Sequence, residues 1–400
     1  IWQTVWLESV PQNYIRSLHV TPLFDAHQVE ITVEGEGQCM IDLEGKRFTF
    51  PAGVPAHVPV QSFRPWSPEH PTLYPFSVTL GDDTVYSYFG MRKCSVETDK
   101  DGVRRLFLNG KPYFHNGLLD QGYWPESQLT PPTDEAMIFD IEKMKELGYN
   151  MLRKHIKEEP LRWYYHCDRL GMLVWQDMIS GGQYIGNVLA GVLPNINIHV
   201  KDSKYKSFKR DKPEWRQEFK DELFGMIDNL YNCVSICCWV PFNEGWGQFD
   251  AKEIGTAIKN YDPSRFVDHA SGWHDQGGPE FKSIHKYILP VHAPTARRTA
   301  GRPIVLSEYG GYSWNIVEHA WNPKRSFGYI MFKNSEKLSA AYKRLHESQV
   351  IPLINKGLCA TVYTQVSDVE FEVNGIYSYD RKILKLDADT VRAVNAKLTY

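Results

Sequence analysis

The chain has 400 residues, of which 42% are hydrophobic and 23% are charged, an ordinary composition that excludes a largely disordered protein. With 45 lysines and arginines against 48 aspartates and glutamates, the formal net charge is −3, so no overall positive field attracts nucleic acid or an acidic membrane surface. No apolar run approaches the roughly 18 residues of a membrane span, and we expect neither a nucleic-acid partner nor a membrane span.

Residues 1–98 are predicted to form a small β-sandwich. Residues 29–34 alternate between apolar and polar side chains, a Glu-Gly turn follows, and residues 40–43 resume the strand. Residues 77–80 and 84–89 form a second predicted hairpin around a polar turn. Because no helical period appears in this part of the chain, the pattern favours two packed antiparallel sheets.

Residues 99–400 are predicted to form a (β/α)8 TIM barrel, because short apolar strands alternate here with helices or long loops. Eight strands are expected, at residues 113–115, 150–153, 172–175, 234–240, 266–270, 284–287, 304–307 and 360–363. Helices are expected at residues 133–147, 160–170, 213–231, 250–261, 336–348 and 389–397. Eight such units over roughly 300 residues suit a closed barrel. An open doubly wound sheet is the alternative, but no dinucleotide or phosphate-binding loop motif supports it.

A long insertion interrupts this alternation after the third strand, at residues 178–212. It ends in the run 201–212, which carries six basic residues against two acidic ones. Such a run could bind an anion, but a charge run is more typical of a solvated face. We therefore expect a solvated loop on the rim of the active site.

Two glutamates stand where a barrel places its reacting groups, directly after apolar strands. Glu244 follows the fourth predicted strand, and Glu308 follows the seventh. Both side chains would point into the same end of an eight-stranded barrel, although they are far apart in sequence. Glycoside hydrolases typically use two carboxylates in one cleft for catalysis. A merely structural role for each carboxylate is the competing interpretation.

The residues around both glutamates resemble glycoside hydrolase family 2. The segment Asn-Glu-Gly-Trp-Gly around Glu244 is similar to the acid/base motif of that family, and Ser-Glu-Tyr-Gly-Gly around Glu308 is similar to its nucleophile motif. Further segments resemble the family in the same chain order: residues 1–8 (the last strand of a jelly-roll domain), 65–74 (the immunoglobulin-like domain), 109–114 and 147–153 (the first two barrel strands).

The resemblance implies a multidomain protein, with an immunoglobulin-like β-sandwich over residues 1–98 followed by a TIM-barrel catalytic domain over residues 99–400. In relatives a jelly-roll domain precedes both of these domains. Residues 1–8 would then be its last strand, and we expect a longer parent protein.

The resemblance further implies retaining, exo-acting hydrolysis of terminal β-glycosides by double displacement. Glu308 would attack the anomeric carbon, and Glu244 would protonate the leaving oxygen and later activate water. Arg153 would hold the nucleophile ionised, Tyr287 would hydrogen-bond it, and Asn243 would donate to the sugar 2-hydroxyl. A surface salt bridge is the competing role for Arg153, and core packing is the competing role for Tyr287.

Five more residues are candidate substrate contacts. Asp120, in the loop after the first strand, would bind sugar hydroxyls or only form a turn. His155 lies one position from where some relatives keep a sugar-contacting histidine. Trp246 and Trp273 are stacking platforms or loop anchors. Tyr363 stands where relatives usually carry a tryptophan at the end of the eighth strand, and it is a candidate to replace that platform.

The sugar is the least decided feature, because members of this family act on β-galactosides, β-glucuronides, β-mannosides and some α-L-arabinosides. Its glucuronidases read the uronate carboxylate with an Asn-x-Lys motif, and the corresponding positions here hold Glu372 and Asn374. An ionised Glu372 would repel a glycone carboxylate. We therefore expect a neutral glycone, galactose first, with a β-glucuronide or another specificity of the family as the alternative.

Other classes of function stay open at this point. A carbohydrate-binding protein on an inactive barrel would be expected to lack one of the two glutamates, and an α/β-hydrolase or dehydrogenase would need motifs that the sequence lacks. The seven cysteines form no CxxC pair, which argues against a zinc ribbon or a disulfide framework. We expect a glycoside substrate, no cofactor and no metal site, and a homo-oligomer is left open.

Overall fold

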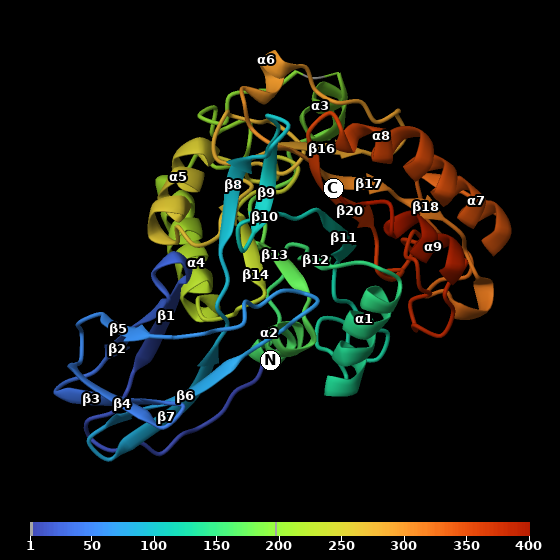
Figure 1. The fold of residues 1–400 in the computed structure, drawn as a ribbon. Coiled ribbons are helices and arrows are strands. Elements are labelled where there is room, and N and C mark those ends of the chain that lie inside the picture. Colours follow the sequence, from blue (N-terminus) through green and yellow to red (C-terminus); the bar gives the residue numbers. More distant parts are fainter. Residues whose placement is uncertain (1–2, 197) are drawn as a thin grey trace.

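Two antiparallel sheets pack face to face in the N-terminal part of the chain (Figure 1). The computed structural model describes residues 3–196 and 198–400. As the alternation predicts, Val29, Ile31 and Val33 are fully buried between the sheets. The β-sandwich prediction is confirmed. One sheet consists of β1 (Ser17–Leu23), β2 (Gln28–Glu34) and β5 (Ala56–Pro59), and the other of β4 (Lys46–Pro51), β3 (Gln38–Leu43), β6 (Tyr74–Leu80) and β7 (Asp83–Phe89).

The strand predicted over residues 1–8 is not observed. Residues 1 and 2 lie outside the described residues, and residues 3–8 form no strand. Val5, Trp6 and Leu7 are 75%, 67% and 97% exposed. A strand needs a neighbour that pairs its N–H and C=O groups, and no described segment forms a ladder with this one. Residues 3–8 therefore form no strand here, and their assignment to the last strand of a jelly-roll domain stays a prediction.

A small third sheet and several buried polar contacts join the sandwich to the barrel. The indole N–H of Trp66 donates to the carbonyl oxygen of Asp168 at 2.8 Å. The guanidinium of Arg92 donates to the carbonyl oxygens of Val234 and Ile236. These bonds fasten the sandwich to the barrel wall. The third sheet consists of β8 (Cys94–Thr98), β9 (Arg104–Leu108) and β10 (Lys111–Pro112).

Eight parallel strands form the barrel, and each of the eight predicted strands has its counterpart. The TIM-barrel prediction is confirmed. Among the described residues no ladder joins β15 to β16, and side chains bridge this seam instead: the Ser283 hydroxyl donates to Asp268 Oδ2 at 2.9 Å and accepts from the Gly272 N–H at 3.2 Å. The order is β15 (Phe266–Val267), β14 (Ile236–Val240), β13 (Leu173–Asp177), β12 (Met151–Lys154), β11 (His115–Asp120), β20 (Leu358–Thr364), β17 (Ile304–Gly310) and β16 (Lys282–Lys286).

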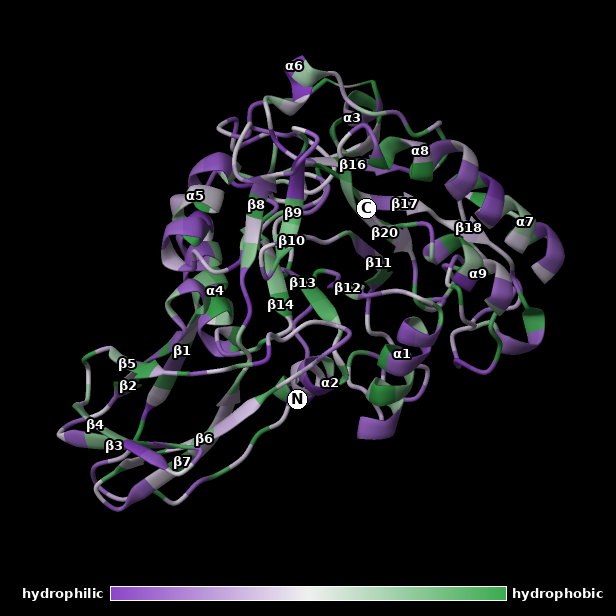
Figure 2. Ribbon diagram, in the orientation of Figure 1, coloured by the Kyte–Doolittle hydropathy of each residue, from purple (hydrophilic) through white to green (hydrophobic). Residues whose placement is uncertain are grey.

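Helices and loops surround these strands (Figure 1). Figure 2 shows hydrophobic residues on β13 and β14, whereas α5 has both hydrophobic and hydrophilic residues. No helix in the described part of the chain combines the length and apolarity that crossing a membrane requires. The helices are α1 (Asp134–Glu146), α2 (Leu161–Leu170), α3 (Leu193–Asn195), α4 (Pro213–Leu230), α5 (Ala251–Tyr261), α6 (Ala296–Thr299), α7 (Ser335–Leu345), α8 (Ile351–Ile354) and α9 (Ala388–Asn395).

The first barrel strand lies further along the chain than predicted. It was expected at residues 113–115 and runs over His115–Asp120. Tyr113 instead donates its backbone N–H to the carbonyl oxygen of Leu106, so it belongs with the small third sheet. Asp120 is consequently the last residue of a strand, whereas the sequence placed it in the following loop.

The basic end of the insertion is only partly solvated. Lys201, Lys204, Lys206 and Lys212 are exposed, as predicted, whereas a few other residues of the run pack against the barrel. Phe208 is fully buried. Asp202 accepts from the N–H of Ala251, and Arg210 donates to the carbonyl oxygen of Gly247 at 2.9 Å. A Cβ at Gly247 would lie 2.1 Å from the Gly181 carbonyl oxygen, so this approach requires glycine. The insertion is fastened to the loop that follows β14.

Candidate active site

Glu244 and Glu308 lie close together at the carboxyl ends of the barrel strands. Glu244 follows β14, and Glu308 lies in β17. A carboxylate oxygen of one lies within 4.8 Å of a carboxylate oxygen of the other. Retaining glycosidases hold their two carboxyl groups about 5–5.5 Å apart, and inverting ones about 6.5–9.5 Å apart. The observed spacing is nearest the retaining geometry.

The backbone of Glu244 is held in a conformation that few non-glycine residues adopt. Its φ is 51°, in the left-handed region. Its N–H donates to the carbonyl oxygen of Ser271 at 3.1 Å, which ties it to the loop after β15. A residue of this kind costs about 1–3 kcal/mol and persists where its surroundings enforce it, most often at active sites.

Glu308 is surrounded by hydrogen-bond donors. Arg153 Nη1 donates to its Oε1 at 3.1 Å, and the Tyr287 hydroxyl donates to its Oε2. His155 Nε2 lies 3.6 Å from Oε1. The Tyr287 hydroxyl also lies 3.2 Å from Thr364 Oγ1, and its ring stacks on Tyr329 with centroids 3.9 Å apart. Both oxygens of Glu308 are therefore fixed in direction.

Arg153 is fully buried, and all five of its N–H groups have acceptors. Two go to the Asp177 carboxylate, each at 2.9 Å. The others go to the carboxylate of Glu308, the carbonyl oxygen of Ser307 and Oδ1 of Asn243. The fixed fork of a guanidinium suits such convergence. Arg153 therefore does not form the surface salt bridge that was considered for it.

His285 contacts Glu244 directly. Its Nδ1 lies 2.9 Å from Oε1 of Glu244, and its Nε2 lies 3.1 Å from Ser271 Oγ and 3.7 Å from Oε1 of Glu308. A Cβ at Gly272 would lie 2.3 Å from this ring, so glycine is required beside it. One imidazole thus lies between the two carboxylates.

The surroundings separate the acidities of the two glutamates. Burial raises the pKa of Glu244 to about 7, against the lowering effect of the Arg153 charge. Burial also raises the pKa of Glu308, and the neighbouring His285 and Arg153 oppose that shift. Burial lowers the pKa of His285 to about 4, so this imidazole is neutral near pH 7. Only Glu308 receives hydrogen bonds from both a guanidinium and a phenol, and we therefore take it as the more acidic of the pair.

Asn243 connects the arginine to His155. Its Oδ1 accepts from Arg153, and its Nδ2 lies 3.0 Å from Nε2 of His155. Nδ1 of His155 is buried and has no hydrogen-bond partner in the described structure. If Asn243 donates to Nε2, the proton of this imidazole resides on Nδ1.

The other predicted contacts are more dispersed. Asp120 is buried, and its oxygens accept from Lys154 Nζ at 2.7 Å and from a turn N–H, which agrees with its structural alternative. Trp246 packs on Tyr184 with ring centroids 5.6 Å apart, and Trp273 lies 6.2 Å from His285. Both tryptophans are partly exposed.

Tyr363 does not form the platform considered for it. It is 1% exposed, and its ring packs against Tyr309 and Tyr342 with centroids 5.5 Å and 5.1 Å apart. Because of its position in β20, the Tyr363 ring points into the barrel wall and belongs to the core.

A cluster without cations lies at the end of β20. Gln365 accepts from Gln121 at 2.9 Å and donates to Asn374 at 2.7 Å. Asn374 donates to Glu372 at 2.8 Å. Glu372 is close enough to Glu244 for its charge to raise the pKa of that residue. The positions compared with the uronate-reading motif are therefore bound to amides.

The sequence predicted no metal site, yet the fold gathers three potential ligands. Single ligand atoms from Glu244, His285 and Glu308 all lie within 4.8 Å of one another. Carboxylate and imidazole are ligands for several divalent ions. The closeness of Glu244 and His285 is explained by the hydrogen bond between them.

The sequence interpretation missed Asp177 and His285. Asp177 ends the apolar strand β13, so the search for polar residues after strands could have found it. His285 lies within β16, two residues before Tyr287, and no local pattern distinguishes it from a core histidine.

Comparisons with known proteins agree with this description. Residues 102–398 match the family model described as "Glycosyl hydrolases family 2, TIM barrel domain", and residues 20–92 match "Glycosyl hydrolases family 2". A β-galactosidase of Vibrio vulnificus is 25% identical over 377 residues, which cover 82% of this chain and 34% of that protein. The β-galactosidase large subunit of Lactobacillus acidophilus is 26% identical over 259 residues, covering 61% and 38%. The chain spans about a third of the length of the curated relatives it matches.

Solved structures share the fold at lower identity. A β-glucuronidase of Ruminococcus gnavus, in complex with uronic isofagomine, has a TM-score of 0.74 at 16% identity, covering 98% of this chain and 70% of that one. A β-galacturonidase of Eisenbergiella tayi, bound to galacturonate, has a TM-score of 0.69 at 19% identity, covering 96% and 72%.

Proposed function

The chain belongs to glycoside hydrolase family 2, and we propose that it carries the catalytic centre of a retaining, exo-acting hydrolase of terminal β-glycosides. The observation that carries this proposal is the pair of carboxylates within 4.8 Å of each other, one of them hydrogen-bonded by Arg153 and Tyr287 and the other with a pKa of about 7. One ionised and one protonated carboxylate are what double displacement requires.

In the first step, Glu308 attacks the anomeric carbon with an electron pair of its carboxylate, and the bond to the leaving oxygen breaks. Glu244 gives its proton to that oxygen, so the leaving group departs as a neutral alcohol. In the second step, Glu244 takes a proton from water, the resulting hydroxide attacks the same carbon, and Glu308 is released as a carboxylate. Each step inverts the anomeric centre, so the product keeps the β configuration.

Arg153 and Tyr287 act on Glu308 in this scheme. Their hydrogen bonds favour the ionised carboxylate before attack and must weaken as its charge is neutralised in the glycosyl-enzyme. Asn243 is the proposed donor to the 2-hydroxyl, and Arg153 orients it by donating to Oδ1. His155 is a further proposed sugar contact. Trp246 and Trp273 are proposed platforms for the sugar rings.

We propose a neutral glycone, galactose first. Glu372, Asn374, Gln121 and Gln365 hydrogen-bond one another, and none of them brings a cation to balance a uronate. The curated relatives named above are β-galactosidases. The solved structures named above act on or bind uronic sugars, and β-glucuronidase is therefore the second candidate.

The roles are tested by kinetics of two variants and by product stereochemistry. Glu308→Ala is expected to abolish turnover without unfolding, and azide should restore activity by attacking from the vacated side to give an α-glycosyl azide. Glu244→Ala is expected to spare activated aryl glycosides more than alkyl glycosides, because an aryl leaving group needs less proton donation. NMR should show the β-sugar as the first product of the unaltered protein.

Three outcomes contradict the proposal. An initial α-product excludes retention, and full activity of Glu308→Ala excludes that residue as the nucleophile. A clear kcat/KM preference for an aryl β-glucuronide over the aryl β-galactoside rejects the neutral glycone alone. Asp389→Asn serves as the matched carboxylate control, because its side chain is 88% exposed and pairs with Arg392 at the surface.

A further inference from the structure

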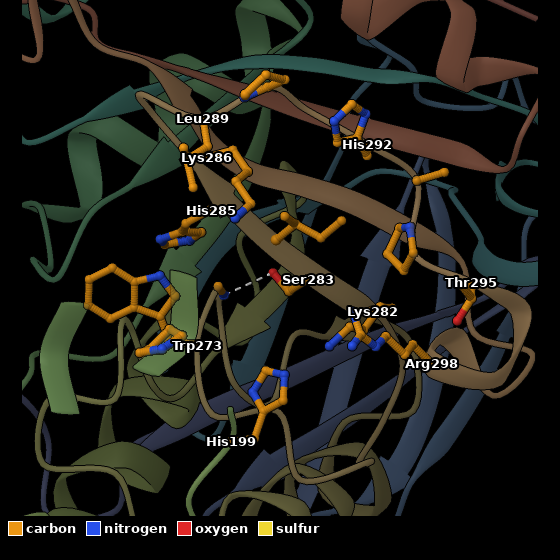
Figure 3. Close-up of a pocket in the computed structure, with 16 residues that line it drawn as sticks. His199, Trp273, Lys282, Ser283, His285, Lys286, Leu289, His292, Thr295 and Arg298 are labelled. Atoms are coloured by element: carbon orange, nitrogen blue, oxygen red, sulfur yellow. Dashed lines mark hydrogen bonds between the residues drawn. The ribbon is translucent and has the colours of Figure 1, made fainter. Parts of the chain in front are cut away.

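A cavity of about 450 Å3 lies beside the candidate active site (Figure 3). Its walls come from β16, from the segment 289–295, from α6 and from the insertion after β13, which contributes His199. This is the part of the barrel where β15 and β16 are not joined by a ladder. Cavities of 300–1,000 Å3 are typical of small-molecule sites.

Positively charged side chains line the cavity. Lys282 and Lys286 both belong to β16, and both line the cavity. Arg298 of α6 adds a third positive charge, and His199 and His292 add two imidazoles (Figure 3). Among the described residues that line it, there is no aspartate or glutamate. This contrasts with the chain as a whole, whose net charge is −3.

These charges are incompletely neutralised. Lys282 donates to Asp275 at 2.8 Å, but Asp275 also accepts two bonds from Arg302, so one carboxylate serves two cations. In the described part of the chain, the side chains of Lys286 and Arg298 have no hydrogen-bond or ion-pair partner. Lys286 is half-buried, and this burial lowers its pKa.

The pKa of His199 is lowered by the same positive charges. Removal from water and the charge of Lys282 lower the pKa of His199 to about 4, and Arg298 contributes in the same direction. The carboxylate of Asp275 opposes the shift without cancelling it. An unpaired positive charge at a partly buried site is costly and is relieved by an anion.

The cavity adjoins the reacting groups through His285 and Trp273, which both line it. The ring of His285 also hydrogen-bonds Glu244, so it borders both spaces. Glu244 is the proposed acid that protonates the leaving oxygen. A ligand in the cavity would therefore lie on the leaving-group side, with Trp273 available to cover a sugar face.

We propose that this cavity is a leaving-group subsite that binds an anionic substituent, a carboxylate or a sulfate, on the sugar that departs. The proposal rests on the proposed function and deepens it: the substrates are acidic saccharides with a neutral glycone at the cleaved end and an acidic residue on the other side of the bond. Arg298 can hold either anion with two parallel hydrogen bonds, and Lys286 supplies a point charge.

The test compares disaccharides with the same β-galactosyl residue and linkage in the full-length protein. The reducing-end sugar is neutral in one, carries a carboxylate in the second and carries a sulfate in the third. We expect kcat/KM to be at least about tenfold higher for one or both acidic disaccharides, since hydrogen bonds to charged groups have that magnitude. The preference should fall as ionic strength rises.

Substitutions then locate the preference. Lys286→Gln and Arg298→Gln are each expected to lower the acidic-to-neutral ratio of kcat/KM by roughly tenfold. Lys46→Gln removes an exposed lysine of the β-sandwich and should leave that ratio unchanged. Which of the two acidic disaccharides is preferred distinguishes a carboxylate ligand from a sulfate ligand.

The outcomes separate this inference from the proposed function. Turnover of 4-nitrophenyl β-galactoside with equal kcat/KM for all three disaccharides overturns the subsite alone. A preference that survives both substitutions also overturns it, because the anion would then be read elsewhere. Absence of turnover on every glycoside, aryl glycosides included, overturns the proposed function and with it the subsite.

Discussion

Nδ1 of His285 lies 2.9 Å from Oε1 of Glu244, and the ring that makes this contact is fully buried and neutral near pH 7. Glu244 itself is 19% exposed through its side chain. The imidazole therefore positions the proposed acid and excludes water from one side of it.

Replacement of His285 is expected to change Glu244 more than it changes the fold. In His285→Ala, water enters beside Glu244, its desolvation decreases, and its pKa falls from about 7 toward the ordinary value. The basic limb of the pH profile should move to lower pH. Activity on alkyl glycosides should fall by roughly tenfold to a hundredfold, with aryl glycosides affected less. His346→Ala, at a second buried histidine bonded to Tyr309, is the control, and an unmoved basic limb in His285→Ala contradicts this role.

The pH dependence of the unaltered protein follows from the two carboxylates. In the proposed mechanism Glu244 must be protonated when the bond breaks, so kcat/KM for an alkyl glycoside should fall about tenfold per pH unit above pH 7. Glu308 must be ionised, and since burial raises its pKa, the acidic limb should lie above the ordinary glutamate range. A profile that stays flat from pH 6 to pH 9 would show that neither assignment holds.

Asp177 is expected to be required for both folding and turnover, because it accepts two hydrogen bonds from the buried Arg153. Asp177→Ala leaves that guanidinium without its main counter-charge and should lower the free energy of unfolding by about 3–5 kcal/mol. Urea unfolding measures the loss. Asp42→Asn breaks an exposed pair with Arg47 and should be close to neutral. Similar midpoints for the two variants would contradict a structural role for the buried pair.

Tyr287→Phe removes one donor to Glu308 and keeps the ring that stacks on Tyr329. Without this hydrogen bond the ionised carboxylate is less stabilised, so the acidic limb should move to higher pH and kcat should fall. Tyr149→Phe is the matched control, since its buried hydroxyl bonds Tyr342 away from both glutamates. An acidic limb that moves equally in both variants would assign the effect to lost core hydrogen bonds.

Glu372→Gln is expected to reduce discrimination against uronides, because it removes the one carboxyl group of the amide cluster. The measured quantity is the ratio of kcat/KM for the aryl β-glucuronide to that for the aryl β-galactoside, and we expect it to rise by several-fold or more. Glu370→Gln, two residues away, is the control. A ratio that does not change would show that Glu372 does not read the glycone.

The architecture and the two glutamates could be predicted from sequence because both depend on local order. Alternation with period two buries Val29, Ile31 and Val33 in any sandwich built from that strand. Glu244 and Glu308 follow apolar strands, and parallel strands of a barrel bring such positions to one end. The first strand was misplaced because Tyr113 extends the apolar run but pairs with Leu106 outside the barrel.

The chemical state of each group was decided only by the tertiary structure. Local sequence patterns were enough to predict the β/α alternation, the two glutamates that follow apolar strands, and Arg153 at the end of the second predicted strand. They could not determine that Asp177 would bind Arg153, that His285 would bind Glu244, or that Tyr363 would be buried in the wall. Burial and charged neighbours set a pKa, and here those neighbours come from strands that are distant in sequence. Their effect therefore exists only once the barrel is formed.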